Sequence, residues 1–120
     1  MNLDFITITL SKIQEFSNDV IYHIEKKYNS DEWIVNELDC HRYRYKNENQ
    51  FIISTVDFQS FLDQFLSLQP SIIPSDKMGL DGTTYKLRVC IGTNKIEISC
   101  WGDDNEIKPL FDCVEKIIRS

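Results

Sequence analysis

Two short runs of alternating apolar residues, with a turn between them, constrain the fold of this chain more than any other feature. Residues 85–91 carry an apolar side chain at every second position, and residues 96–100 repeat the pattern. Gly92 and Asn94, which lie between the runs, are of types favoured in tight turns. Alternation on both sides of a turn predicts a β-hairpin over residues 79–102.

The same residues predict a register for this hairpin. Pairing Ile91 with Ile96 places Val89 opposite Ile98 and gives one wholly apolar face. A shift by one residue would turn the second arm's apolar side chains to the polar face, so such a shift is disfavoured. Trp101 then projects from the polar face.

Three helices are expected to accompany the strands. Ser11 and Gln14 have the spacing of a capping box, and an apolar stripe follows them, which predicts a helix of about 17 residues ending near Asn29. A second helix follows Asp57, and a third has Pro109 in its first turn. The three stripes are Ile13, Phe16, Val20, Ile24 and Tyr28; Phe58, Phe61, Leu62, Phe65 and Leu66; and Ile107, Leu110, Phe111, Val114, Ile117 and Ile118.

A second hairpin is expected between the first two helices. Residues 38–46 alternate, residues 47–49 are typical of a turn, and residues 51–56 have strand character. Residues 5–9 are β-branched and form either a fifth strand or an extended lead-in to the first helix. The expected fold is α+β, with residues 1–120 as a single domain. In it, a mainly antiparallel sheet of two hairpins is covered by three helices in a two-layer sandwich.

Composition favours a globular protein of the cytoplasm. The hydrophobic content is 42%, no apolar run approaches the ~20 residues that cross a bilayer, and the first ten residues lack a basic segment typical of a secretory signal. Four cysteines show no CxxC spacing, and the predicted register puts Cys90 and Cys100 on opposite faces. We therefore expect reduced cysteines, no metal and no membrane association.

Charge and motifs favour a binding protein over an enzyme. The net charge of −6 argues against a nucleic-acid partner, because phosphate contacts need clusters of Lys and Arg. Cys40 and His41 are neighbours on a predicted strand, so their side chains point to opposite faces and cannot form a catalytic pair. No phosphate-binding loop, nucleophile elbow or zinc-protease motif is present. Neither catalysis nor a cofactor is expected.

Two stretches carry a resemblance to known proteins. LDGTTY at residues 80–85 and ISCWG at residues 98–102, followed by a closing helix, resemble small bacterial immunity proteins of polymorphic or contact-dependent toxin systems. The resemblance covers residues 76–120, and the chain departs from the pattern at Cys100, where a second aromatic residue often precedes the tryptophan.

The resemblance implies a monomer that binds a basic toxin domain and inhibits it by occlusion. An acidic protein would bind such a domain with electrostatic steering and a few buried anchors. A tryptophan ringed by acids is typical of a binding hot spot, although a helix or the 70–79 loop would cover Trp101 equally well. The expected contact residues are Trp101, Asp103, Asp104 and Glu106, with Asp31 and Glu32 as a second patch.

A different class of protein has a similar element order. Acidic type III secretion chaperones also combine helices with an antiparallel sheet, and they wrap an unfolded effector segment as dimers. A dimer would favour this alternative, whereas a monomer favours an immunity protein. A deep polar cleft would instead favour an enzyme.

Overall fold

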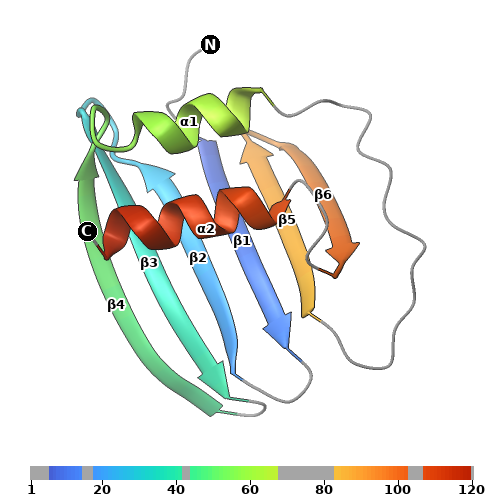
Figure 1. Ribbon diagram of the computed structural model, residues 1–120. Helices are drawn as coiled ribbons and strands as arrows, with labels where there is room; N and C mark the ends of the chain where they lie inside the picture. Colours follow the sequence, from blue (N-terminus) through green and yellow to red (C-terminus); the bar gives the residue numbers. More distant parts are fainter. Residues whose placement is uncertain (1–5, 15–17, 42–43, 68–82, 103–106, 120) are drawn as a thin grey trace.

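The computed structural model describes residues 6–14, 18–41, 44–67, 83–102 and 107–119. These residues form a six-stranded antiparallel sheet in the order β4-β3-β2-β1-β5-β6, with two helices lying across one face (Figure 1). In chain order the elements are β1 (Ile6–Gln14), β2 (Asp19–Lys26), β3 (Glu32–His41), β4 (Arg44–Ser54), α1 (Gln59–Leu66), β5 (Thr83–Ile91), β6 (Asn94–Trp101) and α2 (Ile107–Ile118).

The first strand lies in the middle of the sheet. Strands β1 to β4 form a meander in which each strand pairs with the next. Helix α1 then carries the chain back across the sheet, and β5 pairs with the other side of β1. The β5–β6 hairpin and α2 complete the two layers (Figure 1).

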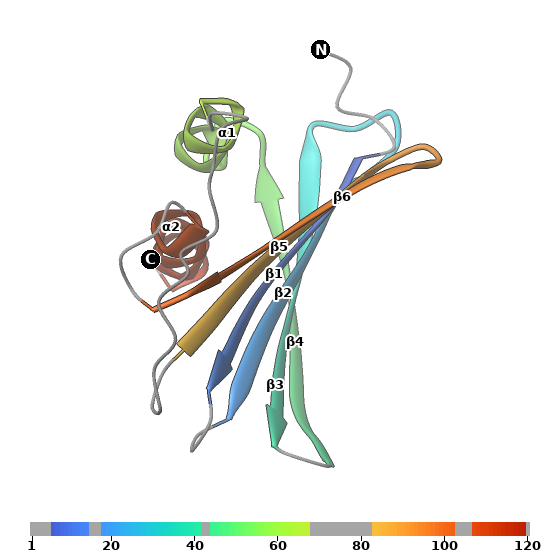
Figure 2. The ribbon, with the colours of Figure 1, turned by 90° about the vertical axis from the view of Figure 1, so that its right-hand side faces the viewer.

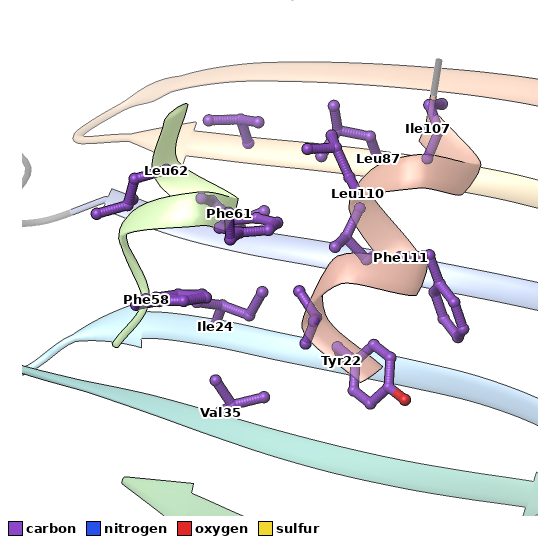
Figure 3. Close-up of a cluster of buried hydrophobic side chains, with 14 of the residues drawn as sticks. Tyr22, Ile24, Val35, Phe58, Phe61, Leu62, Leu87, Ile107, Leu110 and Phe111 are labelled. Carbon is purple, nitrogen blue, oxygen red and sulfur yellow. The ribbon is translucent and has the colours of Figure 1, made fainter. Parts of the chain in front are cut away.

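The hydrophobic core lies between the helices and the face of the sheet beneath them. Every second residue of the central strands points into it, as Ile6, Ile8 and Leu10 do in β1. Figure 3 shows α1 and α2 directing Phe61 and Leu110 into the same layer. Burying such a side chain stabilises the fold by about 1.5–3 kcal/mol. The largest fully buried side chains are Trp33, Tyr22, Tyr85, Phe58, Phe61 and Phe111.

The prediction of a first helix is wrong, because the residues assigned to it form the end of β1 and the whole of β2. The apolar residues Val20, Ile24 and Tyr28 are spaced by four, and a spacing of four fits both a helix and a strand. Tyr22 decides between them: it is fully buried beside Ile24, as the period of two requires. The β-branched residues of this region favour strands as well. The sandwich therefore has six strands and two helices instead of four or five strands and three helices, and it remains α+β.

A second hairpin forms in this region, but its turn was predicted at the wrong residues and its strands were predicted too short. Strand β3 begins at Glu32, and Asn47 and Asn49 lie within β4 instead of in a turn. The two strands connect at residues 42–43, and the register shifts by a bulge between Asp39 and Cys40. Asparagine is enriched in turns, but here pairing with β3 outweighs that preference.

The expected C-terminal hairpin forms, but with a different register. Val89 pairs with Ile96 and Leu87 with Ile98, so each partner is shifted by two residues from the expected one. A shift of two keeps the same residues on each face, so the apolar pattern cannot distinguish the registers. The turn decides instead: residues 92–93 form a two-residue loop, in which Gly92 has a positive φ of 60°.

The other two predicted helices form, although Asp57 does not cap α1, whose N-cap is Phe58 without a side-chain hydrogen bond. Phe61 and Leu62 of α1 are buried, and so are the α2 residues Leu110 and Phe111. Leu66, expected in the apolar stripe of α1, is instead 49% exposed.

Two isoleucines provide a matched test of this core. Ile24 is fully buried, whereas Ile52 is 58% exposed on the other face of the sheet. We expect Ile24→Ala to lower the free energy of unfolding by about 2–5 kcal/mol and Ile52→Ala by less than about 1 kcal/mol. Urea denaturation followed by circular dichroism measures both. Equal losses would contradict the arrangement of the two faces.

Candidate protein-binding surface

One whole face of the sheet carries none of the helices that the structure describes. In Figure 2 both helices lie on the same side of the twisted sheet, and the opposite side is bare among the described residues. We call this side the open face. It presents the residues that alternate with the core positions, such as Thr7 and Thr9 of β1 or Ile34 and Asn36 of β3. Most of these side chains are half-buried by their neighbours on the sheet.

A row of polar side chains crosses the middle of the open face, with one residue on each strand. The cross-strand pairing places these residues side by side. In strand order, the polar row is Gln50, Asn36, His23, Thr9, Arg88 and Glu97.

Hydrogen bonds orient four of the six residues in the polar row. The Gln50 Nε2 donates to Asn36 Oδ1 over 3.2 Å, and His23 Nδ1 lies 3.2 Å from Thr9 Oγ1. An Asn or Gln side chain has both donors and acceptors, so one such bond leaves further capacity for a partner.

At the other end of the row, Glu97 forms ion pairs with Arg88 and Lys95. Its Oε2 lies 3.5 Å from Arg88 Nη2 and 3.5 Å from Lys95 Nζ. These pairs are exposed and contribute little to stability. They do, however, hold the charges of β5 and β6 in a defined arrangement.

Four apolar side chains of β2, β3 and β4 flank the polar row, two on each side. Ile21 lies opposite Leu38 on one side, and Ile34 lies opposite Ile52 on the other. Ile52 is 58% exposed, and the other three are half-buried. A central polar row with apolar flanks resembles the mixture of apolar area and hydrogen-bonding groups found in protein–protein interfaces.

The expected hot-spot tryptophan lies on the open face. Trp101 ends β6, is half-buried and pairs with Thr84. The expected acidic contacts Asp103, Asp104 and Glu106 lie outside the described residues.

The second expected patch lies at the opposite end of the sheet. Cross-strand pairs connect Cys100, next to Trp101, through β5, β1 and β2 to Asp39 of β3. Glu32 is seven residues from Asp39 along β3, which corresponds to roughly 23 Å at the rise of a strand. Asp31, which precedes β3, is exposed at the same end as Glu32. Trp101 and the pair Asp31 and Glu32 therefore do not form one compact site.

A buried carboxylate, which the sequence reasoning missed, lies on the helix-covered face. Glu37 is only 7% exposed, and its Oε2 accepts a 2.8 Å charge-assisted bond from Arg119 Nη2. Asn49 Nδ2 lies 3.5 Å from its other oxygen. This ion pair joins the end of α2 to β3, so its role is structural. An acidic residue at a core-facing position of a strand would have indicated this buried carboxylate. It was not recognised because no strand was predicted at Glu37.

Tyr22 lies beside this ion pair. Its ring packs on Phe111 with the centroids 4.7 Å apart, and Figure 3 shows its hydroxyl at the edge of the apolar cluster. Burial, followed by the charges of Glu37 and Glu115, raises the pKa of Tyr22 above its ordinary value. The phenol is therefore neutral at physiological pH.

The described residues contain no grouping typical of metal chemistry. No three His, Cys, Asp or Glu side chains among them are placed to hold a metal ion. None of the helices described is long and apolar enough to cross a membrane.

Comparisons with known proteins return no match, either to a protein-family model or to a curated protein.

Arg119 and Arg88 allow the buried ion pair to be compared with an exposed one. Arg119→Ala would leave the Glu37 carboxylate buried without its cation, so we expect the free energy of unfolding to fall by roughly 1–3 kcal/mol. Arg88→Ala removes an exposed pair, with an expected loss below about 1 kcal/mol. Urea denaturation at pH 7 measures the difference, and a larger effect at Arg88 would refute a structural role for Glu37.

The raised pKa of Tyr22 predicts that the protein loses stability at high pH. Its pKa is higher in the folded than in the unfolded protein, so above about pH 10 the unfolded state releases a proton that the folded state retains. The free energy of unfolding should therefore fall as the pH rises beyond that value. Tyr22→Phe should make this fall less steep. Denaturation at pH 8 to 11 tests the prediction, and identical slopes for both proteins would disprove it.

Proposed function

We propose that this protein is an immunity protein, which binds a cognate basic toxin domain and neutralises it by occlusion. The observation that carries the proposal is the open face, on which oriented polar groups are flanked by apolar side chains. The resemblance of residues 80–85 and 98–102 to immunity proteins supports the same function.

The open face has a suitable size for a stable interface. Six strands about 4.8 Å apart span about 24 Å, and eight residues along a strand span about 26 Å. The flat area of the sheet is therefore roughly 600 Å², and side chains that project from it add to the accessible surface. This is comparable to the ~800 Å² that each partner of a standard protein complex buries.

Charge on the open face favours a basic partner. On the half formed by β2, β3 and β4, Glu25, Glu32 and Glu48 lie on the open face. Lys27, which follows β2, forms an exposed ion pair with Glu32 over 3.8 Å, and Arg44 and Lys46 belong to the first part of β4. On the other half, Lys86 and Arg88 give β5 basic character. Together with the net charge of −6, the acidic half would steer a basic domain towards the β2–β4 side.

A cellular experiment tests the function. If a neighbouring gene encodes a toxic domain, its expression should stop bacterial growth, and co-expression of this chain should restore it. This chain should be a monomer when purified alone. It should form a complex when mixed with the purified toxin domain. A toxic neighbour that this chain does not neutralise would refute the proposal. A stable dimer that binds an unfolded effector segment would support the secretion-chaperone alternative instead.

Two variants test the surface. Asn36→Arg adds a cation to the centre of the acidic half, and we expect it to weaken toxin binding at least tenfold, which corresponds to about 1.4 kcal/mol. Gln59→Arg adds the same charge to the exposed surface of α1 and should leave the affinity within about twofold. Surface plasmon resonance measures both, and thermal unfolding checks that each variant folds. Equal affinities would exclude the open face.

A charge reversal tests the expected acidic contacts separately. Replacing Asp103 and Asp104 with Lys should slow association at low salt if these residues steer the partner. Unchanged association kinetics would remove these two residues from the interface.

A further inference from the structure

Strand β4 forms one edge of the sheet, and part of its backbone points away from the sheet. Thr55 N–H donates to Asp31 C=O over 2.7 Å, which marks a hydrogen-bonded pair at the end of the β3–β4 ladder. Hydrogen-bonded and non-bonded pairs alternate in an antiparallel ladder. The N–H and C=O groups of Gln50 and Ile52 are consequently directed to the outer edge.

This part of the edge lacks the common protections against strand pairing. Lysine, proline and bulges usually protect an exposed edge. Residues 47–54 read NENQFIIS and contain neither lysine nor proline. The basic residues Arg44 and Lys46 and the bulge at Cys40 all lie towards the other end of the strand.

A groove opens beside this edge, between α1 and α2. Its volume is about 820 Å³, and its end at β4 is lined by Phe51, Ile53, Ile117 and Ile118. Side chains on the helix-covered face of an added strand would lie next to Phe51 and Ile53. They would therefore enter the apolar end of this groove.

We propose that an extended segment of the partner protein binds along β4 as a seventh strand. Apolar side chains at alternate positions of the segment enter the groove, while its backbone bonds to Gln50 and Ile52. The inference rests on the proposed function, because the partner is the domain that covers the adjacent acidic half of the open face. It adds the mode of binding.

Charge favours a basic segment over a second copy of this chain. Glu48 and Asp57 lie at the two ends of this edge region. Two copies of this chain each carry a net charge of −6 and would repel one another. A segment with Lys or Arg beside its apolar residues meets the same region with opposite charge.

Proline substitutions at the two edges of the sheet test the inference. Gln50→Pro removes an N–H that points away from β3, so the fold should be retained while strand addition at β4 is blocked. It also removes the side chain that bonds to Asn36, and Gln50→Ala, which keeps the N–H, measures the effect of that loss alone. Ser99→Pro is the matched control on the other edge. Gly102 N–H donates to Thr83 C=O over 2.8 Å, so by the same alternation the Ser99 N–H points outward from β6.

The probe is a library of random decapeptides, displayed on yeast and selected against the full chain. We expect selected peptides to carry apolar residues at alternate positions with at least one Lys or Arg. Gln50→Pro should weaken them at least tenfold and Ser99→Pro less than twofold. Bound peptide should slow amide hydrogen exchange at Gln50 and Ile52.

Several results would overturn the inference. These are a selection without binders, binders that Gln50→Pro leaves unaffected, and protection confined to other strands. A dimer in light scattering that Gln50→Pro converts to monomers would assign the edge to a second copy. The proposed function is tested separately by growth: if Gln50→Pro still neutralises the toxin at full affinity, the function stands and strand addition fails.

Discussion

The packing of two helices against one face of the sheet is the interaction on which the rest of this structure depends. Phe58 and Phe61 of the α1 region stack 4.7 Å apart, and Phe58 meets Trp33 of β3 edge-to-face at 5.3 Å. At the other helix, Phe111 packs on Tyr22 of β2. Because the helices occupy only one face, the same packing leaves the other face to the residues between the core positions. The open face is thus a direct consequence of the two-layer core.

The sequence predicts an element correctly where the spacing of its apolar residues fits only a helix or only a strand. It fails where the spacing fits both. The stripe of α2, with Ile107, Leu110, Phe111 and Val114, repeats the spacing of three, which a strand face does not produce, and it was predicted correctly. The failed first stripe has this spacing once, between Ile13 and Phe16. The spacing of four between Val20 and Ile24 fits a strand equally well, and there the prediction failed. Pairing with a central β1 then favoured the strand, and a single sequence does not display that tertiary contact.

Less of the candidate surface could be predicted than of the fold. The face of Trp101 followed from alternation alone, since residue parity survives a register shift of two. The polar row could not be foreseen, because it needs the register of all six strands. The segment with Thr9 was left open between a strand and a lead-in, and the segment with His23 was predicted as a helix. Glu37 was missed because the predicted strand began at Leu38, and its partner, Arg119, is distant in the sequence.

The central position of the N-terminal strand has a consequence for biosynthesis. The β1–β5 ladder pairs Ile6 with Ile91, so the sheet cannot close until most of the chain has left the ribosome. The meander of β1 to β4 can assemble earlier, but its apolar face remains uncovered until α2, which follows all six strands in the chain, has been translated. A nascent chain of this topology exposes a ready surface for aggregation during that interval, and its yield in a cell should depend on how quickly chaperones shield it.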